Sequence, residues 1–321
     1  MKAGAIMLRR KLEFAENEKG SLFIITLFVM VIFLGLGAAF MVMGGIGALS
    51  SSAPLAWISN LIGWRMTLIG VGAVTLVMAA LVYGFVRNRP AEMGLAPIKA
   101  ADEAEVEKIG LVDGLKMVVF SRRFWPIGIW AFCVIGISFA VGGLWGGPYL
   151  MHVYGLSKTA AGGVLSTFAM SLIFGSPLFG WLGNRFGRKP VLVGCSMVLM
   201  AVCGLLSWFV DTLSLPELYT LFLFFFITGG AIGPVIATVS KESFPIAISG
   251  TSVGMVNLFP FAGATLFQIL IGAVLTAQSH GQTPYATVGY QYMFLICLAG
   301  ATLSLAAALV IKETLPVSKR S

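Results

Sequence analysis

Long apolar stretches separated by short polar segments dominate this 321-residue chain. A helix needs about 20 apolar residues to cross a membrane, because each residue adds about 1.5 Å and the hydrocarbon core is about 30 Å thick. The pattern predicts eight spanning helices, at residues 21–62, 66–86, 124–151, 160–183, 190–210, 217–240, 250–277 and 289–311. We therefore expect an all-α, polytopic membrane helix bundle.

The first stretch, 21–62, is about twice as long as one straight crossing requires. It fits one long tilted or broken helix, or a span joined to an in-plane or re-entrant piece. Gly44, Gly45 and Pro54 are candidate break points. The residues leave these alternatives open.

Composition and charge placement exclude a soluble protein and set the topology. The mean hydropathy is +0.94, and only 11% of the residues are charged. If 21–62 crosses once, 19 of the 21 Lys and Arg fall on one side, with Arg65 and Lys158 opposite. By the positive-inside rule that side is cytoplasmic and holds both termini. The net charge of +8 thus reflects membrane topology rather than nucleic-acid binding, and we expect a multi-pass protein of a bacterial inner membrane with the lipid bilayer as its partner.

The residues offer no enzyme chemistry, cofactor site or metal site. Four cysteines fall inside predicted spans without a CxxC pattern, and the two histidines lie far apart in the sequence. No nucleophile–base arrangement or paired carboxylate is apparent. All 13 acidic residues lie outside the hydrophobic cores, so no intramembrane proton carrier is visible.

One long polar segment, 87–123, divides the chain. Its apolar residues recur at helical spacing near the end, at Leu111, Leu115, Val118 and Val119, which predicts a short helix at the cytoplasmic interface. The chain is thus organised as an N-terminal region with two spans (1–86), a cytoplasmic central loop (87–123), a region of six spans (124–311) and a cytoplasmic tail (312–321).

A glycine-rich basic segment, Gly180–Pro190, lies between two of the later spans. Its glycines permit close helix approach and unusual backbone angles, and its cations favour the anionic cytoplasmic face. Its notable residues are Gly180, Gly183, Asn184, Arg185, Gly187, Arg188 and Lys189. The segment resembles the signature loop of the major facilitator superfamily, which has Asp where this chain has Asn184.

Other stretches resemble the same superfamily, among them Gly63–Arg65, Arg89–Leu95, Trp145–Met151 and Lys241–Pro245. The resemblance implies two six-helix halves joined by a cytoplasmic loop, with alternating access around a midplane site. If 87–123 is that loop, the chain holds a complete C-terminal half and only two helices of the N-terminal half. We then expect an N-terminally truncated transporter, in which the apolar residues 21–37 look foreign to the family.

The resemblance implies secondary active or facilitated transport of a small solute, and a non-transporting membrane fragment or assembly partner is the alternative. In the family the signature loop is thought to latch helices together, and the uncharged Asn184 predicts a weaker latch. Candidate pathway residues are the polar groups within the spans, Trp145, Tyr149, Asn257 and Gln268. A predicted gating or packing element comprises Gly229, Gly230, Gly233 and Pro234.

Overall fold

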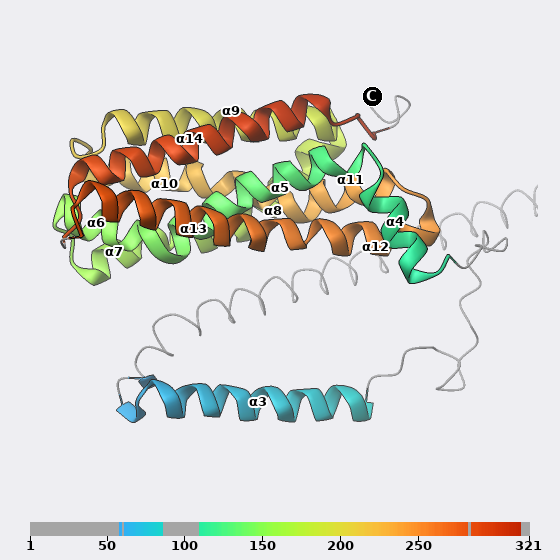
Figure 1. Ribbon diagram of the computed structural model, residues 1–321, viewed down its shortest axis with the longest axis horizontal. Helices are drawn as coiled ribbons and strands as arrows, with labels where there is room; N and C mark the ends of the chain where they lie inside the picture. The colour runs from blue at the N-terminus through green and yellow to red at the C-terminus, as the bar shows by residue number, and fades with distance from the viewer. Residues whose placement is uncertain (1–57, 60, 86–108, 282–283, 316–321) are drawn as a thin grey trace, which may run out of the picture. The chain divides into compact units, whose positions relative to one another are not determined.

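A computed structural model describes residues 58–59, 61–85, 109–281 and 284–315, and these residues form helices and no strand. The chain divides into two compact units, Met1–Ile98 and Lys99–Ser321. The described residues of the first unit form mainly one helix, α3 (Trp64–Phe85). The second unit holds every later helix (Figure 1).

Among the described residues of the second unit, the first helix is the short α4 (Leu111–Val119), which confirms the helix predicted there. The remaining helices follow in this order: α5 (Phe124–Ala140), α6 (Gly146–Tyr154), α7 (Lys158–Leu165), α8 (Thr167–Phe186), α9 (Arg188–Trp208), α10 (Leu215–Ile227), α11 (Ala237–Glu242), α12 (Ile246–Val256), α13 (Leu258–Gln278) and α14 (Thr287–Val310). Two π-helices, η2 (Val141–Trp145) and η4 (Ile232–Ile236), and one 3-10 helix, η3 (Thr228–Ala231), join some of them.

Seven helical segments of the described residues are long and apolar enough to cross a membrane. The first is α3, which matches the predicted span 66–86. The other six match the six predicted later spans: Phe124–Tyr154, Lys158–Phe186, Arg188–Trp208, Leu215–Glu242, Ile246–Gln278 and Thr287–Val310. The predicted span 21–62 lies almost entirely outside the described residues.

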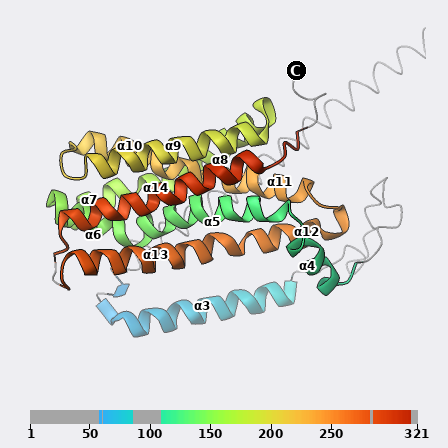
Figure 2. The ribbon, with the colours of Figure 1, turned by 45° about the horizontal axis from the view of Figure 1, so that its top comes forward.

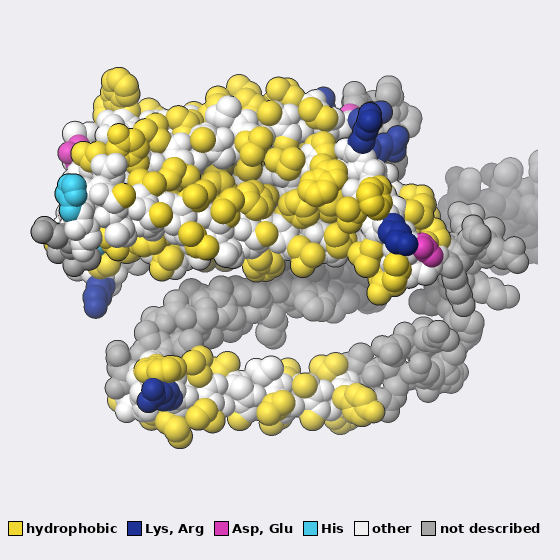
Figure 3. Space-filling model, in the orientation of Figure 1, with side chains coloured by type: hydrophobic (Ala, Val, Ile, Leu, Met, Phe, Trp, Pro, Cys, Tyr) yellow, Lys and Arg dark blue, Asp and Glu magenta, His cyan; other side chains and the backbone are white. Residues whose placement is uncertain are grey.

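The spans of the second unit lie side by side, and their surfaces are apolar along most of their length. Charged residues therefore lie at the ends of the spans. Figure 3 shows hydrophobic side chains along the length of this bundle and coloured charged groups at its two ends. Arg122 and Arg123 precede α5, while Lys189, Lys241 and Lys312 lie at the ends of other spans. We call the end of the bundle that holds these five residues and Arg188 the basic end. An integral multi-pass membrane fold follows from this arrangement.

Helix α5 lies at the centre of the bundle and packs against α13 and α14 (Figure 1). Its Trp130 is fully buried and donates its indole N–H to Ser196 Oγ of α9 at 3.0 Å. Ser304 of α14 donates to the same oxygen at 2.9 Å. These bonds satisfy polar groups away from water, so three helices are held together inside an apolar core.

A glycine pair allows α5 and α13 to approach closely. A Cβ atom built on Gly136 would lie only 2.7 Å from the carbonyl carbon of Gly263. The two backbones can come this close only because neither glycine carries a side chain. Small residues at crossings allow membrane helices to pack closely in this way. This close crossing fixes the position of α5 relative to α13.

Two spans are interrupted at matching places. The π-helices begin 17 residues into their spans, counted from Phe124 to Val141 and from Leu215 to Ile232. The first span runs away from the basic end and the second runs toward it, as Figure 1 shows. Because π-turns leave the regular hydrogen-bond ladder, these are the places where each span can bend most readily.

Candidate functional site

The glycine-rich basic segment forms a much shorter turn than its sequence suggests. Helix α8 continues to Phe186 and α9 begins at Arg188, so Gly187 alone connects them. Its φ of 102° lies in the region that only glycine adopts readily. The predicted spans left residues 184–189 as the connection, and the structure corrects this, because Asn184 and Arg185 are helical along with Gly180 and Gly183.

Gly180 and Gly183 instead serve the close approach that was predicted for them. A Cβ atom on Gly180 would lie 3.4 Å from Pro234 Cβ, and one on Gly183 would lie 3.4 Å from a methyl group of Val235. Both neighbours belong to η4. The glycines of α8 thus form the surface on which the interrupted span rests.

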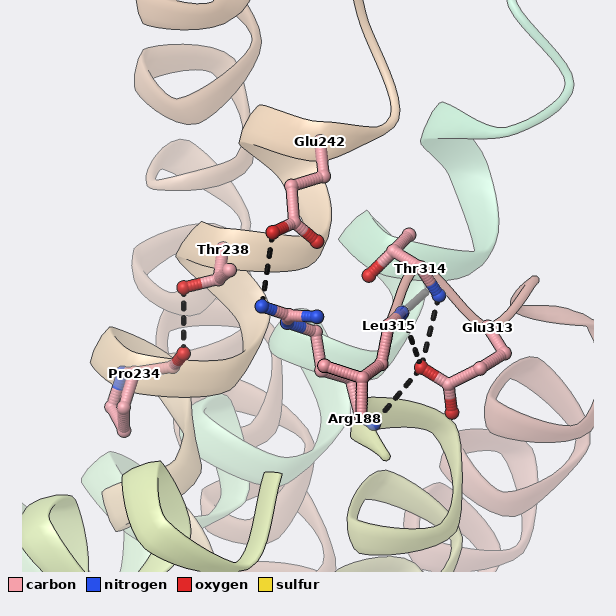
Figure 4. A network of polar contacts seen from close by, with 7 residues as sticks. All are labelled: Arg188, Pro234, Thr238, Glu242, Glu313, Thr314 and Leu315. Atoms are coloured by element: carbon pink, nitrogen blue, oxygen red, sulfur yellow. Dashed lines mark hydrogen bonds and ion pairs between the residues drawn. The ribbon is translucent and has the colours of Figure 1, made fainter. Parts of the chain in front are cut away.

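An ion pair and a helix cap surround the turn at the basic end, as Figure 4 shows. The Arg188 guanidinium lies 2.9 Å from the Glu242 carboxylate at the end of α11. Glu313, which follows α14, accepts the backbone N–H groups of Arg188 and Lys189 at 3.1 Å each. Lys189 Nζ donates to the Leu309 carbonyl of α14 at 2.6 Å. The start of α9 is thereby attached to two other spans.

Glu313 is well suited to capping because its carboxylate meets the exposed N–H groups and the positive dipole end of α9. Burial would by itself raise the pKa of the Glu313 carboxyl. The backbone N–H groups of Leu315, Arg188, Lys189 and Thr314 outweigh burial and hold this pKa below its ordinary value. The carboxylate is therefore charged at neutral pH.

The carboxylates at the turn thus come from positions that sequence reasoning did not assign to it. Asn184, where the family has Asp, is exposed on α8. Glu242 is the last residue of one span and Glu313 follows another. Both spans end on the same side as the turn, and this shared side is the signal in the sequence that could have found them. The weaker latch inferred from Asn184 stays a prediction. The network at this turn contains two acids at other positions, Glu242 and Glu313.

Arg185 lies apart from this network. Its guanidinium carbon is 6.0 Å from the centre of the Trp181 ring and 5.8 Å from that of Phe186. Both distances are within the range of a cation–π interaction. The portion of the chain that the structure describes offers Arg185 no ion pair.

The predicted gating or packing element occupies η3 and η4. A Cβ atom on Gly230 would lie 2.9 Å from the backbone of Gly175 on α8, so the two backbones touch. Pro234 has no N–H to donate to the Gly230 carbonyl four residues earlier, and Ser176 of α8 donates to that carbonyl at 3.3 Å instead. Packing and bending here follow from these contacts, and gating by Gly229, Gly230, Gly233 and Pro234 stays a prediction.

The structure brings together two of the predicted pathway residues and separates a third from them. Trp145 is half-buried and donates its indole N–H to the Gln268 backbone carbonyl at 3.0 Å. Tyr149 is 0% exposed and donates to the Val210 carbonyl at 2.8 Å among other aromatic rings. Tyr149 is therefore a core residue in this conformation, and its assignment to a solute pathway stays a prediction.

Asn257 and Gln268 do share one face of their span, and an aromatic residue lies between them. Asn257 joins α12 to α13 with helical backbone angles, so the periodicity continues through it. Phe261, four residues after Asn257 and seven before Gln268, falls on the same face and is 65% exposed. We call Asn257, Phe261 and Gln268 the α13 polar-aromatic face.

Two further spans place aromatic rings beside this face. Phe139 of α5 stacks on Phe261 with ring centres 5.9 Å apart, and Phe168 of α8 lies 5.8 Å from Phe139 at a steep angle. Sequence reasoning missed all three phenylalanines because it searched for polar groups. Helical spacing from Asn257 and Gln268 was a signal that could have found Phe261.

Within the described residues no group of three His, Cys, Asp or Glu side chains could hold a metal ion. The four cysteines, Cys133, Cys195, Cys203 and Cys297, are free and buried.

Comparisons with known proteins identify a family and several relatives of this chain. A family model described as the Major Facilitator Superfamily matches residues 141–321. The membrane sensor protein UhpC of Salmonella typhimurium is 24% identical, covering 64% of this chain and 48% of its own length. The cis,cis-muconate transport protein of Acinetobacter baylyi is 26% identical, covering 74% and 56%. A probable hexose phosphate transport protein of Chlamydia trachomatis is 24% identical, covering 66% and 51%.

The chain spans about half the length of the curated relatives it matches. Among solved structures, the proton:xylose symporter XylE is similar, with 20% identity and a TM-score of 0.48 over 60% of this chain and 45% of that one.

Proposed function

The chain belongs to the major facilitator superfamily, and we propose that residues 124–311 form the C-terminal six-helix half of a transporter that moves a small solute by alternating access. Members of this family are integral multi-pass membrane proteins and are not enzymes in general. Secondary active and facilitated transport both fit this proposal.

The aromatic cluster of three spans is the observation that carries the proposal. Phe139 and Phe261 each follow the first residue of their span by about 15 positions, close to the middle of spans of 31 and 33 residues. Solute sites of such transporters lie near the bilayer midplane between the two halves. A face that offers aromatic rings with Asn257 and Gln268 at this depth is suited to one wall of that site.

The interrupted spans support the movement that alternating access requires. The regular ladder of hydrogen bonds is broken at η2 in one span and at η3 and η4 in another. Non-regular helix within a membrane is tolerated where protein or a water-filled cavity surrounds it. We infer that these segments bend as the pathway opens at either side.

The network at the basic end supports movement of the half as one body. Arg188 and Glu242 join the start of α9 to the end of α11, and Glu313 joins α9 to the end of α14. Rigid-body rocking of one half against the other is the usual motion of such transporters. By the charge distribution we place this end and both termini in the cytoplasm of a bacterium with the protein in its inner membrane.

The solute class follows only in outline. No Asp, Glu, Lys or Arg lies between Phe124 and Ser157 or between Ile246 and Val310, and a charged solute in a membrane site needs a charged partner. We infer a neutral or zwitterionic solute, or recognition of charge by a second half. The relatives' names include a muconate and a hexose phosphate transporter, so they do not share one solute.

The length comparison favours a second candidate function, a non-transporting membrane fragment that associates with another membrane protein. The relatives are about twice as long as the matched portion of this chain, and one half supplies only one wall of a central pathway. We therefore propose that this chain alone does not move solute across a membrane.

Proteoliposomes that contain only this chain test the last point. Uptake of labelled glucose, glucose 6-phosphate and cis,cis-muconate should not exceed that of empty liposomes. Saturable uptake of any of them would show that one half suffices and would overturn the fragment interpretation.

The thermal stability of the chain in the presence of solute tests whether the α13 polar-aromatic face binds solute. A solute that contacts the face should raise the Tm of the chain, and the rise should disappear in Phe261→Ala. The control is Leu266→Ala, which removes an exposed side chain turned by roughly 140° from Phe261 on the same helix. A rise that is equal in both variants would contradict a role for this face.

A further inference from the structure

An apolar groove of about 400 Å³ opens between α8, α9, α10 and the start of η3, and its lining includes no residue of the α13 polar-aromatic face. Figure 2 shows α8, α9 and α10 next to one another. The lining of the groove includes Leu178, Phe186, Pro190, Val198, Phe224 and Thr228.

The lining can hold only an apolar molecule. Nearly all the side chains are hydrocarbon, and the one hydroxyl, of Thr228, already donates to the Phe225 carbonyl at 2.9 Å. A ligand with polar groups inside the groove would lose its hydrogen bonds to water without replacement. Leu178, Phe186 and Phe224 are substantially exposed along its edges, so the groove is open to the surface.

The groove runs along the helices rather than across them. It extends from Phe186 and Pro190, beside the Gly187 turn, to Leu178 and Val198, which are eight residues deeper on α8 and α9. Eight residues of helix correspond to roughly 12 Å. The groove is therefore a slot that begins at the ends of α8 and α9 and runs toward the middle of the membrane. A lipid acyl chain runs in the same direction from its headgroup.

A cation lies at the end of the slot. The guanidinium carbon of Arg185 is 5.8 Å from the centre of the Phe186 ring, which forms a wall of the groove. Among the residues that the structure describes, Arg185 has no ion pair. Glu313, the acid at the neighbouring turn, is engaged by backbone N–H groups. Since the span ends at Phe186, Arg185 is at the level of lipid headgroups.

We propose that this groove binds one acyl chain of an anionic phospholipid and that Arg185 pairs with the phosphate of its headgroup. Burial of the methylene groups of the chain favours binding of any lipid, and a cation near the membrane surface favours an anionic one. The lipid packs against Phe186 and Pro190, on both sides of Gly187, and so supports the turn from the membrane side.

Open space beside Gly194 allows a larger side chain to fill the groove. A Cβ atom on Gly194 would meet nothing within 4 Å, so Gly194→Leu would place its side chain in the groove without displacing a neighbour. Gly204 lies on the same helix, also has nothing within 4 Å of a Cβ atom, and does not line the groove. Gly204→Leu is therefore a matched control.

The test is native mass spectrometry of the full chain, delipidated in maltoside detergent and titrated with phosphatidylglycerol or phosphatidylcholine. The unsubstituted chain should retain one phosphatidylglycerol more tightly than one phosphatidylcholine. Gly194→Leu should weaken binding of both lipids at least about tenfold, since several methylene groups lose their site, while Gly204→Leu should bind as the unsubstituted chain does. Arg185→Gln should reduce the preference for phosphatidylglycerol about fivefold, which corresponds to about 1 kcal/mol.

Equal lipid retention by Gly194→Leu and Gly204→Leu would overturn the groove as the site. Equal affinity of the unsubstituted chain for both lipids would overturn the role of the anionic headgroup, and no retained lipid would show that the groove is closed or filled by protein. If Gly194→Leu does not fold, Leu178→Trp fills the groove from the α8 wall and should give the same loss.

Discussion

Arg188, the first residue of α9, holds Glu242, the last residue of α11, in an ion pair of 2.9 Å. The two side chains differ in environment, since that of Arg188 is 9% exposed and that of Glu242 is 37% exposed. One guanidinium nitrogen of Arg188, Nη1, is buried and has no hydrogen-bond partner among the residues that the structure describes. The buried cation therefore depends on a carboxylate that is itself partly in water.

Replacing Glu242 by Gln should destabilise the fold by about 1–3 kcal/mol. Removing one partner of a buried pair leaves an uncompensated charge, and the partial exposure of Glu242 reduces that cost. The Tm of the purified chain measures the effect. Lys241→Gln is the control, because it removes a charge from the adjacent exposed position outside the pair. Equal Tm values for the two variants would show that the pair does not hold α9 to α11.

Replacing Glu313 by Gln should cost about 1 kcal/mol at neutral pH, because α9 loses a charged cap. The folded-state pKa of Glu313 lies below that of an unfolded chain. Its stabilisation is therefore complete above the ordinary pKa of about 4.5 and is lost as the pH falls through the lower folded-state value.

Tm measured from pH 7 to pH 3 for the unsubstituted chain and for Glu313→Gln checks this sign. The difference between the two should shrink as the acid range is entered. A difference that stays constant with pH would mean that the carboxylate charge is not what stabilises the turn.

Replacing Gly187 by Ala should destabilise the turn by about 1–3 kcal/mol. The backbone angles of Gly187 are reserved for glycine, and an added Cβ atom would lie 2.5 Å from a Glu313 carboxylate oxygen. Gly162→Ala is the control, since Gly162 lies in α7 with open space around it and should gain helix stability of about 0.5–1 kcal/mol. If Gly187→Ala matches Gly162→Ala in Tm, the turn is not constrained as described.

The helices and their order could be predicted because apolar length is a local property of the sequence. Six spans match within a few residues at most ends. The extent of the Gly187 turn could not be predicted, because Gly180 and Gly183 suit both a turn and a close helix contact. The contact with η4 decides between the two, and it is not local.

The site was less predictable for a similar reason. Tyr149 and Trp145 are four residues apart, yet Tyr149 packs in the core while Trp145 packs on α13. The partners of Arg188 come from the ends of two other spans, and only the folded bundle places Glu242 and Glu313 together. Asn257 and Gln268 could be placed on one face because that relation depends on helical periodicity alone.

Replacing Gly136 by Ala should destabilise the bundle by about 1–3 kcal/mol, since α5 and α13 would have to move apart. Gly254→Ala is the control, because Gly254 of α12 has nothing within 4 Å of a Cβ atom. Tm measures both. Equal values would indicate that the crossing is loose enough to accept a methyl group.

In the proposed transporter half, the α13 polar-aromatic face lines a water-accessible solute pathway. The most direct test of this proposal is labelling of single cysteines by a membrane-impermeant, charged thiol reagent in membrane vesicles, after replacement of the four buried native cysteines. Cysteine at Asn257, Phe261 or Gln268 should react, and cysteine at Leu266, on the opposite side of the same helix, should not. Protection at all four positions, or equal reaction at all four, would show that this face does not line a water-accessible pathway.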